Sequence, residues 1–186
     1  MGWTSVFLDR GFSKTISSKK KKEFLDGEFS IGDDKILKSS MVGNTYYAAL
    51  ETTRRDTNER FVFALVVMTS VSGSEFSFKE MDESMMPYQF ECPVGILNLL
   101  SETDSEHAND WRNRCHELRK NKTLLDKGKL DDQIKIKDSS GKDRLLTYTL
   151  TSTNGTKKWV DKQTNTYFNK SFILEREIEF LYKNEE

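Results

Sequence analysis

Cysteine, proline and histidine are scarce in this chain of 186 residues, which contains two of each. The two cysteines and an N-terminus without a secretory signal predict reduced thiols and a protein of the cytoplasm. The low proline count and the ten glycines argue against long low-complexity linkers. No apolar run approaches the roughly 20 residues that a membrane-spanning helix needs. We therefore expect a soluble cytoplasmic protein.

An excess of charge of either sign is also missing, since 29 lysines and arginines face 30 aspartates and glutamates. This balance excludes a strongly basic nucleic-acid binder and an acidic protein that imitates DNA through its charge. The sequence contains no phosphate-binding loop, dinucleotide-binding glycine pattern or nucleophile elbow. The soft ligands Cys92, His107, Cys115 and His116 match no zinc spacing. We therefore predict no bound metal among these residues.

Residues 61–68 (FVFALVVM) are eight consecutive apolar residues, and five of them are aromatic or β-branched. A strand with one face in solvent would alternate, so this run predicts a strand that is buried on both faces. A buried helix is the alternative, but eight residues are short for a helix, and the Phe and Val content favours a strand.

The neighbouring segments predict an antiparallel meander around this strand, with strands at 35–42, 45–51 and 75–81. Gly43 and Asn44 are typical of a two-residue hairpin turn. A fifth strand is predicted near the N-terminus, at 3–8. A short helix at 19–25 begins with four lysines, which form either a solvated helix face or a small phosphate-binding patch.

Two helices are predicted after the meander, at 93–100 and 104–121. Pro93 suits the first position of the former, and its apolar residues Val94, Ile96, Leu97, Leu99 and Leu100 predict deep burial. Thr103 and Glu106 have the spacing of a capping box at the start of the second. That helix carries one apolar stripe, made by Ala108, Trp111, Cys115 and Leu118.

The pattern changes after Thr123 to short β-like runs at 134–137, 145–150, 158–160, 167–168 and 178–182, separated by turn residues. This spacing predicts a small SH3-like barrel of about five strands. The sequence therefore predicts an α+β domain at 1–122, with an antiparallel sheet covered by two helices, and a β-rich module at 123–186.

An acidic segment follows the predicted strand at 75–81 and contains Glu80, Asp82 and Glu83. Carboxylates at a strand end can hold Mg²⁺ for phosphodiester cleavage. They can equally cap the next turn or pair with Lys79 and Arg112. The loop beyond them, which includes Met85, Met86 and Tyr88, has the Met and aromatic content of an adaptable binding surface.

Arg112, His116 and Arg119 recur at spacings of four and three, so they share one side of the second helix. Such a ridge can contact phosphates or an acidic protein partner. A solvated helix flank is the alternative interpretation.

Three groups of residues carry a resemblance. They are MGWTS at 1–5, KSSMVGNTYYAA at 38–49, and MDES at 81–84 with Pro87, CP at 92–93, TD at 103–104 and NDWR at 109–112. Together, over roughly residues 1 to 120, they resemble a family of small proteins encoded on phages, plasmids and conjugative elements of Gram-positive bacteria. The family is catalogued mostly as a domain of unknown function, and it supplies no agreed catalytic residues to transfer.

Some proteins associated with that family inhibit type II CRISPR effectors, one of them with shortening of the guide RNA. The resemblance implies an anti-CRISPR protein that binds a Cas9-type effector or its guide RNA. If RNA is cut, Glu80, Asp82 and Glu83 would supply metal ligands or a base, with Mg²⁺ as cofactor. Lys38, Lys79 and Arg112 would then neutralise phosphates. The alternatives are a non-enzymatic adaptor that docks through the barrel and a stand-alone nuclease.

Overall fold

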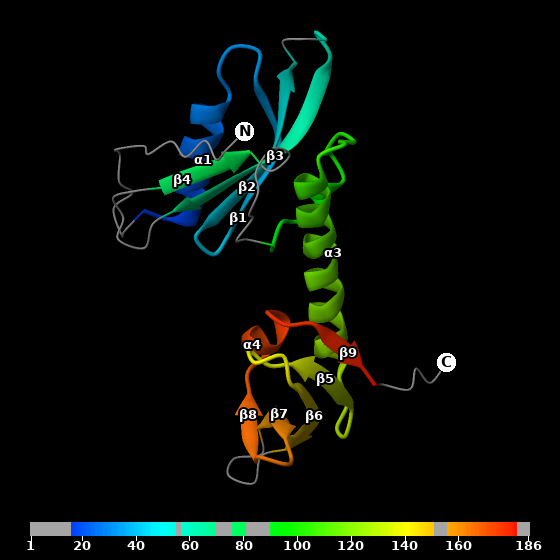
Figure 1. Ribbon diagram of the computed structural model, residues 1–186. Coiled ribbons are helices and arrows are strands. Elements are labelled where there is room, and N and C mark those ends of the chain that lie inside the picture. Colours follow the sequence, from blue (N-terminus) through cyan, green and yellow to red (C-terminus); the bar gives the residue numbers. More distant parts are fainter. Residues whose placement is uncertain (1–15, 55–56, 70–75, 81–89, 151–155, 182–186) are drawn as a thin grey trace. The chain divides into compact units, whose positions relative to one another are not determined.

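The computed structural model describes residues 16–54, 57–69, 76–80, 90–150 and 156–181 (Figure 1). Its helices and antiparallel sheets make the α+β class predicted from the sequence. The chain divides into two compact units, residues 1–116 and residues 117–186. This division falls inside helix α3 (Glu106–Lys127), as does the boundary predicted between residues 122 and 123.

The first unit contains the meander of strands β1 (Lys35–Val42), β2 (Thr45–Thr53), β3 (Arg60–Thr69) and β4 (Phe76–Glu80). They pair in chain order, each antiparallel to the next. Gly43 has a φ of +58° in the turn between β1 and β2, a conformation that glycine adopts at little cost. The four predicted strands are therefore confirmed. The fifth, near the N-terminus, lies outside the described residues.

Strand β3 is buried on both faces, as its uninterrupted apolar run predicted. On one face, Phe63 and Leu65 pack in a cluster with Leu25, Tyr46 and other apolar side chains. On the opposite face, Ala64 packs in a second cluster, which we call the alanine-face core; its buried members are Tyr47, Ala49, Ala64, Val66, Cys92, Ile96, Leu97, Trp111 and Cys115. Successive side chains of a strand point to opposite faces, so one run of residues supplies both cores.

Helices cover both faces of this sheet. On one face, α1 (Ser18–Phe29) contributes the fully buried Leu25. On the other, α2 (Val94–Leu97) contributes Ile96 and Leu97, and α3 contributes Trp111 and Cys115. The predicted sheet with two covering helices is thus present, and α1 adds a third.

Helix α2 is shorter than the predicted helix at 93–100. Pro93 is its N-cap rather than its first helical residue. Val94 and Leu99 are 40% and 39% exposed, so the prediction that they would be buried was wrong. Four helical residues form little more than one turn, and only Ile96 and Leu97 of that turn face the sheet. An apolar composition alone did not reveal which side chains would face solvent.

Helix α3 begins two residues later than predicted. Ser105 directly precedes the helix, and its Oγ accepts a hydrogen bond from the Ala108 N–H at 3.3 Å. The predicted cap, Thr103, instead accepts from the Ser105 N–H through its Oγ1 at 3.2 Å. Both residue types can cap a helix, and the observed cap is the one that reaches the third helical N–H.

The same helix continues beyond its predicted end at residue 121. Its buried stripe, confirmed at Ala108, Trp111 and Cys115, extends to Leu125, which is 4% exposed. Leu125 belongs to the core of the second unit. Burial against residues distant in the sequence therefore keeps the last turns helical, although the local sequence there resembles a helix end.

Asp26 of α1 joins the helix to the first two strands. Its carboxylate accepts hydrogen bonds from the Lys22 ammonium at 2.7 Å, the Ser39 hydroxyl at 2.5 Å and the Tyr46 hydroxyl at 2.8 Å. Burial acts to raise the pKa of Asp26, but these three hydrogen bonds outweigh it and lower the pKa below 3.8. Burial, followed by the bond to Asp26, raises the pKa of Tyr46.

Replacing Tyr46 by phenylalanine should destabilise the first unit by about 1 to 2 kcal/mol, because a buried ring loses its hydrogen bond to a partly exposed carboxylate. Urea unfolding at pH 7 measures the change. Tyr167→Phe serves as the control, since this tyrosine is 46% exposed and its hydroxyl can remain hydrated. Equal stabilities of Tyr46→Phe and the unmodified protein would contradict the role assigned to Asp26.

The second unit contains five strands and a short helix: β5 (Gln133–Lys137), β6 (Asp143–Leu150), β7 (Lys157–Asp161), β8 (Thr166–Phe168), α4 (Lys170–Leu174) and β9 (Ile178–Phe180). The strand order is β8-β7-β6-β5-β9, and every pair is antiparallel. In β5, Ile134 and Ile136 are buried while Lys135 and Lys137 are more exposed, the alternation of a strand with one face in the core.

This sheet packs its inner face around Ile134, Ile136, Leu146, Trp159 and Ile173. Strands β8 and β9 form its edges, and no ladder joins them among the described residues. The predicted small β-rich module is therefore a five-stranded antiparallel sheet, and SH3-like closure stays a prediction. Within the same residues, no helix is long and apolar enough to span a membrane.

Candidate functional site

The predicted catalytic segment falls mostly outside the described residues. This applies to Asp82, Glu83 and the binding candidate Tyr88. Lys79 and Glu80 lie on β4, where their backbones pair with Val66 and Leu65 of β3. The predicted carboxylate site therefore stays a prediction.

Arg112 lines a polar cavity in the first unit. Ser101 is anchored to β3, because its N–H donates to the Val62 carbonyl at 2.8 Å and its Oγ accepts from the Val62 N–H at 2.9 Å. Arg112 donates from Nη1 to the Ser101 carbonyl at 2.7 Å. The predicted phosphate-binding arginine thus holds the connection that leads into α3.

The cavity at Arg112 encloses about 670 Å³ and is lined by Arg54, Glu102, Thr103, Asp104, Ser105, Asn109 and Arg112. Its two arginines are balanced by two carboxylates. The charges that line the cavity therefore favour neither an anion nor a cation. The cavity alone indicates no class of ligand.

Of the predicted binding residues whose side chains the structure describes, Lys38, His116 and Arg119 are not among those that line this cavity. Lys38 is exposed on β1. Its ammonium lies over Gly95 of α2, so close that a Cβ placed on Gly95 would be 2.6 Å from the Lys38 Nζ. His116 and Arg119 are exposed on α3.

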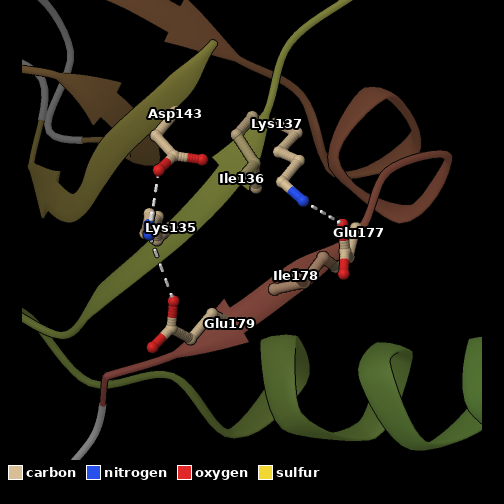
Figure 2. A pocket seen from close by; sticks show the side chains of 7 residues that line it. All are labelled: Lys135, Ile136, Lys137, Asp143, Glu177, Ile178 and Glu179. Atoms are coloured by element: carbon tan, nitrogen blue, oxygen red, sulfur yellow. Dashed lines mark hydrogen bonds and ion pairs between the residues drawn. The ribbon is translucent and has the colours of Figure 1, made fainter. Parts of the chain in front are cut away.

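A second hollow lies on the outer face of the second sheet, and its charges are already paired (Figure 2). Lys135 lies between Asp143 at 2.9 Å and Glu179 at 3.6 Å, and Lys137 pairs with Glu177 at 2.9 Å. Hydrogen bonding to Asp143 and to Glu177 raises the pKa values of Lys135 and Lys137, respectively. Opposite charges on adjacent strands stabilise strand pairing, so we assign this hollow a structural role.

A third hollow brings aromatic and basic side chains together in the second unit. We call it the aromatic–lysine groove. It encloses about 470 Å³ and is lined by Leu125, Asp126, Tyr148, Lys157, Lys158, Trp159, Tyr167, Phe168, Asn169 and Lys170. This volume lies in the range of ligand pockets, which are roughly 300 to 1,000 Å³.

Strand register creates the aromatic wall of the groove. Trp159 of β7 lies opposite Tyr148 of β6 and opposite Phe168 of β8. The Tyr148 and Trp159 ring centroids are 4.9 Å apart, with the planes tilted by 34°. Trp159 is only 4% exposed, whereas the neighbouring Tyr167 is 46% exposed. Tyr167 is thus the ring that is most open to a ligand.

Lysines from two elements surround these rings. Lys157 and Lys158 are exposed on β7, and the Lys158 ammonium lies 5.4 Å from the Tyr167 ring centroid. No ion pair engages either lysine within the part of the chain that the structure describes. Lys170 of α4 pairs with Asp126 of α3. Burial and the nearby Lys122 lower the pKa of Lys170.

The two units differ in charge, although the whole chain is nearly neutral. Residues 117–186 contain 15 lysines and arginines and 12 aspartates and glutamates, a net charge of +3. Residues 1–116 contain 14 and 18, a net charge of −4. The groove therefore lies in the half of the molecule that favours anions.

Sequence reasoning missed the groove, because it considered the C-terminal β-rich module as a docking surface without naming any residues there. Two signals were available. One is the charge difference between the two parts of the chain, which directs the search for an anion-binding surface to the C-terminal part. The other is the occurrence of lysines close to aromatic residues in the segments around Trp159 and Tyr167.

The described residues contain no group of three or more His, Cys, Asp or Glu side chains that could hold a metal ion. The groove instead offers rings and ammonium groups, which suit a ligand with flat aromatic parts and negative charge. Comparison of this chain with protein-family models, curated proteins and solved structures finds no match.

Proposed function

We propose that this protein binds RNA and acts as an anti-defence protein that inhibits a CRISPR–Cas9-type nuclease by engaging the guide RNA of the effector. The aromatic–lysine groove carries the RNA-binding part of the proposal, since lysines and accessible rings are the usual contacts of proteins that bind single-stranded nucleic acid. The choice of target rests on the resemblance of residues 1–5, 38–49 and 81–112 to proteins of mobile elements.

Guide-RNA cleavage is a separate part of the proposal. It requires Mg²⁺ and the carboxylates of Glu80, Asp82 and Glu83. The groove needs neither, because lysine and aromatic side chains bind RNA without cutting it. Inhibition by binding is therefore the simpler form of the proposed function. A non-enzymatic adaptor, docking through a second unit with SH3-like closure, is the competing proposal.

One experiment separates these forms. Purified protein is incubated with Cas9 and guide RNA, with and without Mg²⁺, and both complex formation and RNA length are followed on gels. We expect a stable complex with intact RNA and loss of DNA cleavage by Cas9. Shortening of the RNA that requires Mg²⁺ and is lost in the double variant Asp82→Ala, Glu83→Ala would establish cleavage. Absence of both binding and cutting would favour the adaptor.

The chain offers a matched control for the binding surface. Lys157→Ala, Lys158→Ala removes two positive charges from the groove, and Lys135→Ala, Lys137→Ala removes two from the ion-paired outer face of the same sheet. We expect the groove variant to lose most binding to the guide RNA and the outer-face variant to retain it. Equal losses would show that net charge, rather than the groove, determines binding.

A further inference from the structure

We infer that the aromatic–lysine groove accepts an unpaired base of a single-stranded nucleic acid, stacked on Tyr167, with the flanking phosphates bound by lysines. This inference deepens the proposed function and rests on it for the biological target. It specifies the class of ligand as single-stranded and sequence-tolerant.

The accessible ring is the first observation that supports stacking. Trp159 and Phe168 are occupied by the protein itself: Trp159 is buried against Tyr148, and the Phe168 ring centroid lies 5.1 Å from that of Phe172. Tyr167 belongs to the edge strand β8 and leaves 46% of its surface exposed. A base that stacks on Tyr167 therefore displaces no core side chain, and every base has a π face to offer.

The lysines provide the second observation. Lys158 lies 5.4 Å from the Tyr167 ring centroid, on the same face of the sheet as that ring. Lys157, on the other face of β7, and Lys170 of α4 also line the groove. Ammonium groups from two elements can contact the phosphates that precede and follow a stacked base. The carboxylate of Asp126 is engaged by Lys170, so it opposes the approach of phosphate less than a free aspartate would.

This arrangement disfavours a duplex. Paired bases are stacked inside a helix and present only their edges, so they cannot lie flat on Tyr167 without unpairing. An acidic peptide is the other partner that three lysines would suit. The peptide would use the charges but would gain little from the exposed aromatic ring, and this difference makes the two partners distinguishable.

The test uses the full chain and a fluorescently labelled 12-nucleotide oligouridine, with binding followed by anisotropy. A blunt-ended RNA duplex of equal length serves as the paired probe. Tyr167→Ala should weaken binding of the oligouridine by about tenfold, within the range of single stacking contacts. Tyr167→Phe retains the ring and should bind as the unmodified protein does. The double variant Lys157→Ala, Lys158→Ala should reduce the slope of log affinity against log salt by about 0.7 for each phosphate that it no longer neutralises.

Several results would overturn the inference. These are equal affinity for duplex and single strand, binding that is unchanged in Tyr167→Ala, or displacement of oligouridine by poly-glutamate as readily from Tyr167→Phe as from Tyr167→Ala. Its failure remains distinct from failure of the proposed function. If Tyr167→Ala binds Cas9 with guide RNA as tightly as the unmodified protein does, the stacking inference is wrong and the proposed target still stands. If oligouridine binds through Tyr167 but Cas9 is not inhibited, the stacking inference is right and the proposed target is wrong.

Discussion

Replacing Trp111 by alanine should destabilise the first unit by about 3 to 5 kcal/mol, the range observed when a large buried ring is removed. Trp111 is fully buried in the alanine-face core, with Ala64 of β3 and Ala49 of β2. These alanines leave space over the sheet that the indole fills. Removing the indole leaves a cavity beside these alanines, so the loss includes both the transfer term and a cavity term.

Hydrogen exchange of the β2 and β3 amides, together with urea unfolding followed by circular dichroism, measures this effect within the first unit. Asn113→Ala is the matched control, because Asn113 is exposed on the same helix and alanine has the higher helix propensity. It should leave stability unchanged or slightly raised. A loss below about 1 kcal/mol for Trp111→Ala would show that α3 does not pack against the sheet as described.

The second large effect is expected at Asp161 of β7, which is 4% exposed. Its Oδ1 accepts from the backbone N–H groups of Gln163 at 2.9 Å and Thr164 at 3.3 Å, and its Oδ2 accepts from Arg144 at 3.1 Å. Arg144 also donates from Nε to Asp138 at 2.8 Å. One carboxylate therefore fixes the turn after β7 and connects β7 to β6.

Asp161→Ala should destabilise the second unit by about 2 to 3 kcal/mol, because it leaves the two backbone donors and Arg144 without their buried acceptor. Urea unfolding at pH 7, read from hydrogen exchange in β6 and β7, measures the loss. Asp143→Ala is the control, since it removes an exposed carboxylate from the same sheet, where an ion pair contributes little. Equal losses in the two variants would contradict the role of Asp161.

The pH dependence of this unit follows from the same carboxylates. Burial acts to raise the pKa of Asp161, but hydrogen bonds from Thr164, Gln163 and Arg144 outweigh it and lower the pKa below 3.8. Hydrogen bonding from Ser140 is the main cause that lowers the pKa of Asp138. A depressed folded-state pKa gives stability that is present above the unfolded value and is lost as the pH falls through the folded value.

We therefore expect the free energy of unfolding of the second unit to fall as the pH decreases below about 4. The asparagine side chain in Asp161→Asn cannot ionise. This variant should therefore be less stable than the unmodified protein at pH 7, and its free energy of unfolding should decrease less steeply between pH 5 and pH 2. Denaturant titrations at a series of pH values test this, with the unmodified protein as reference. Parallel curves for the two proteins would show that Asp161 does not take part in the linkage.

Much of the first sheet could be predicted from residues 35–81, because the signals there are local. The run at 61–68 specifies a strand buried on both faces, and Gly43 supplies the backbone freedom that a tight turn requires. The helices were harder to delimit. The end of α3 depends on Leu125, whose burial in the core of the second unit involves residues distant in the sequence.

The candidate site was not predicted, for a related reason. Its rings come from β6, β7 and β8, and only strand register places Tyr148, Trp159 and Phe168 side by side. The predicted carboxylates and the ridge on α3 were chosen from residues close together in sequence. Proximity along the chain does not show which side chains will share a cavity.

The sequence alone determined that the protein is α+β, that an apolar strand forms the centre of its first sheet, and that a β-rich module follows. These features depend on periodicity and turn residues, which act over a few positions. Only the tertiary structure decided which charges are paired on the outer face of the second sheet and which lysines remain beside an exposed ring. That choice depends on pairing between distant strands, because their register determines which side chains are buried, which are neutralised and which remain available to a partner.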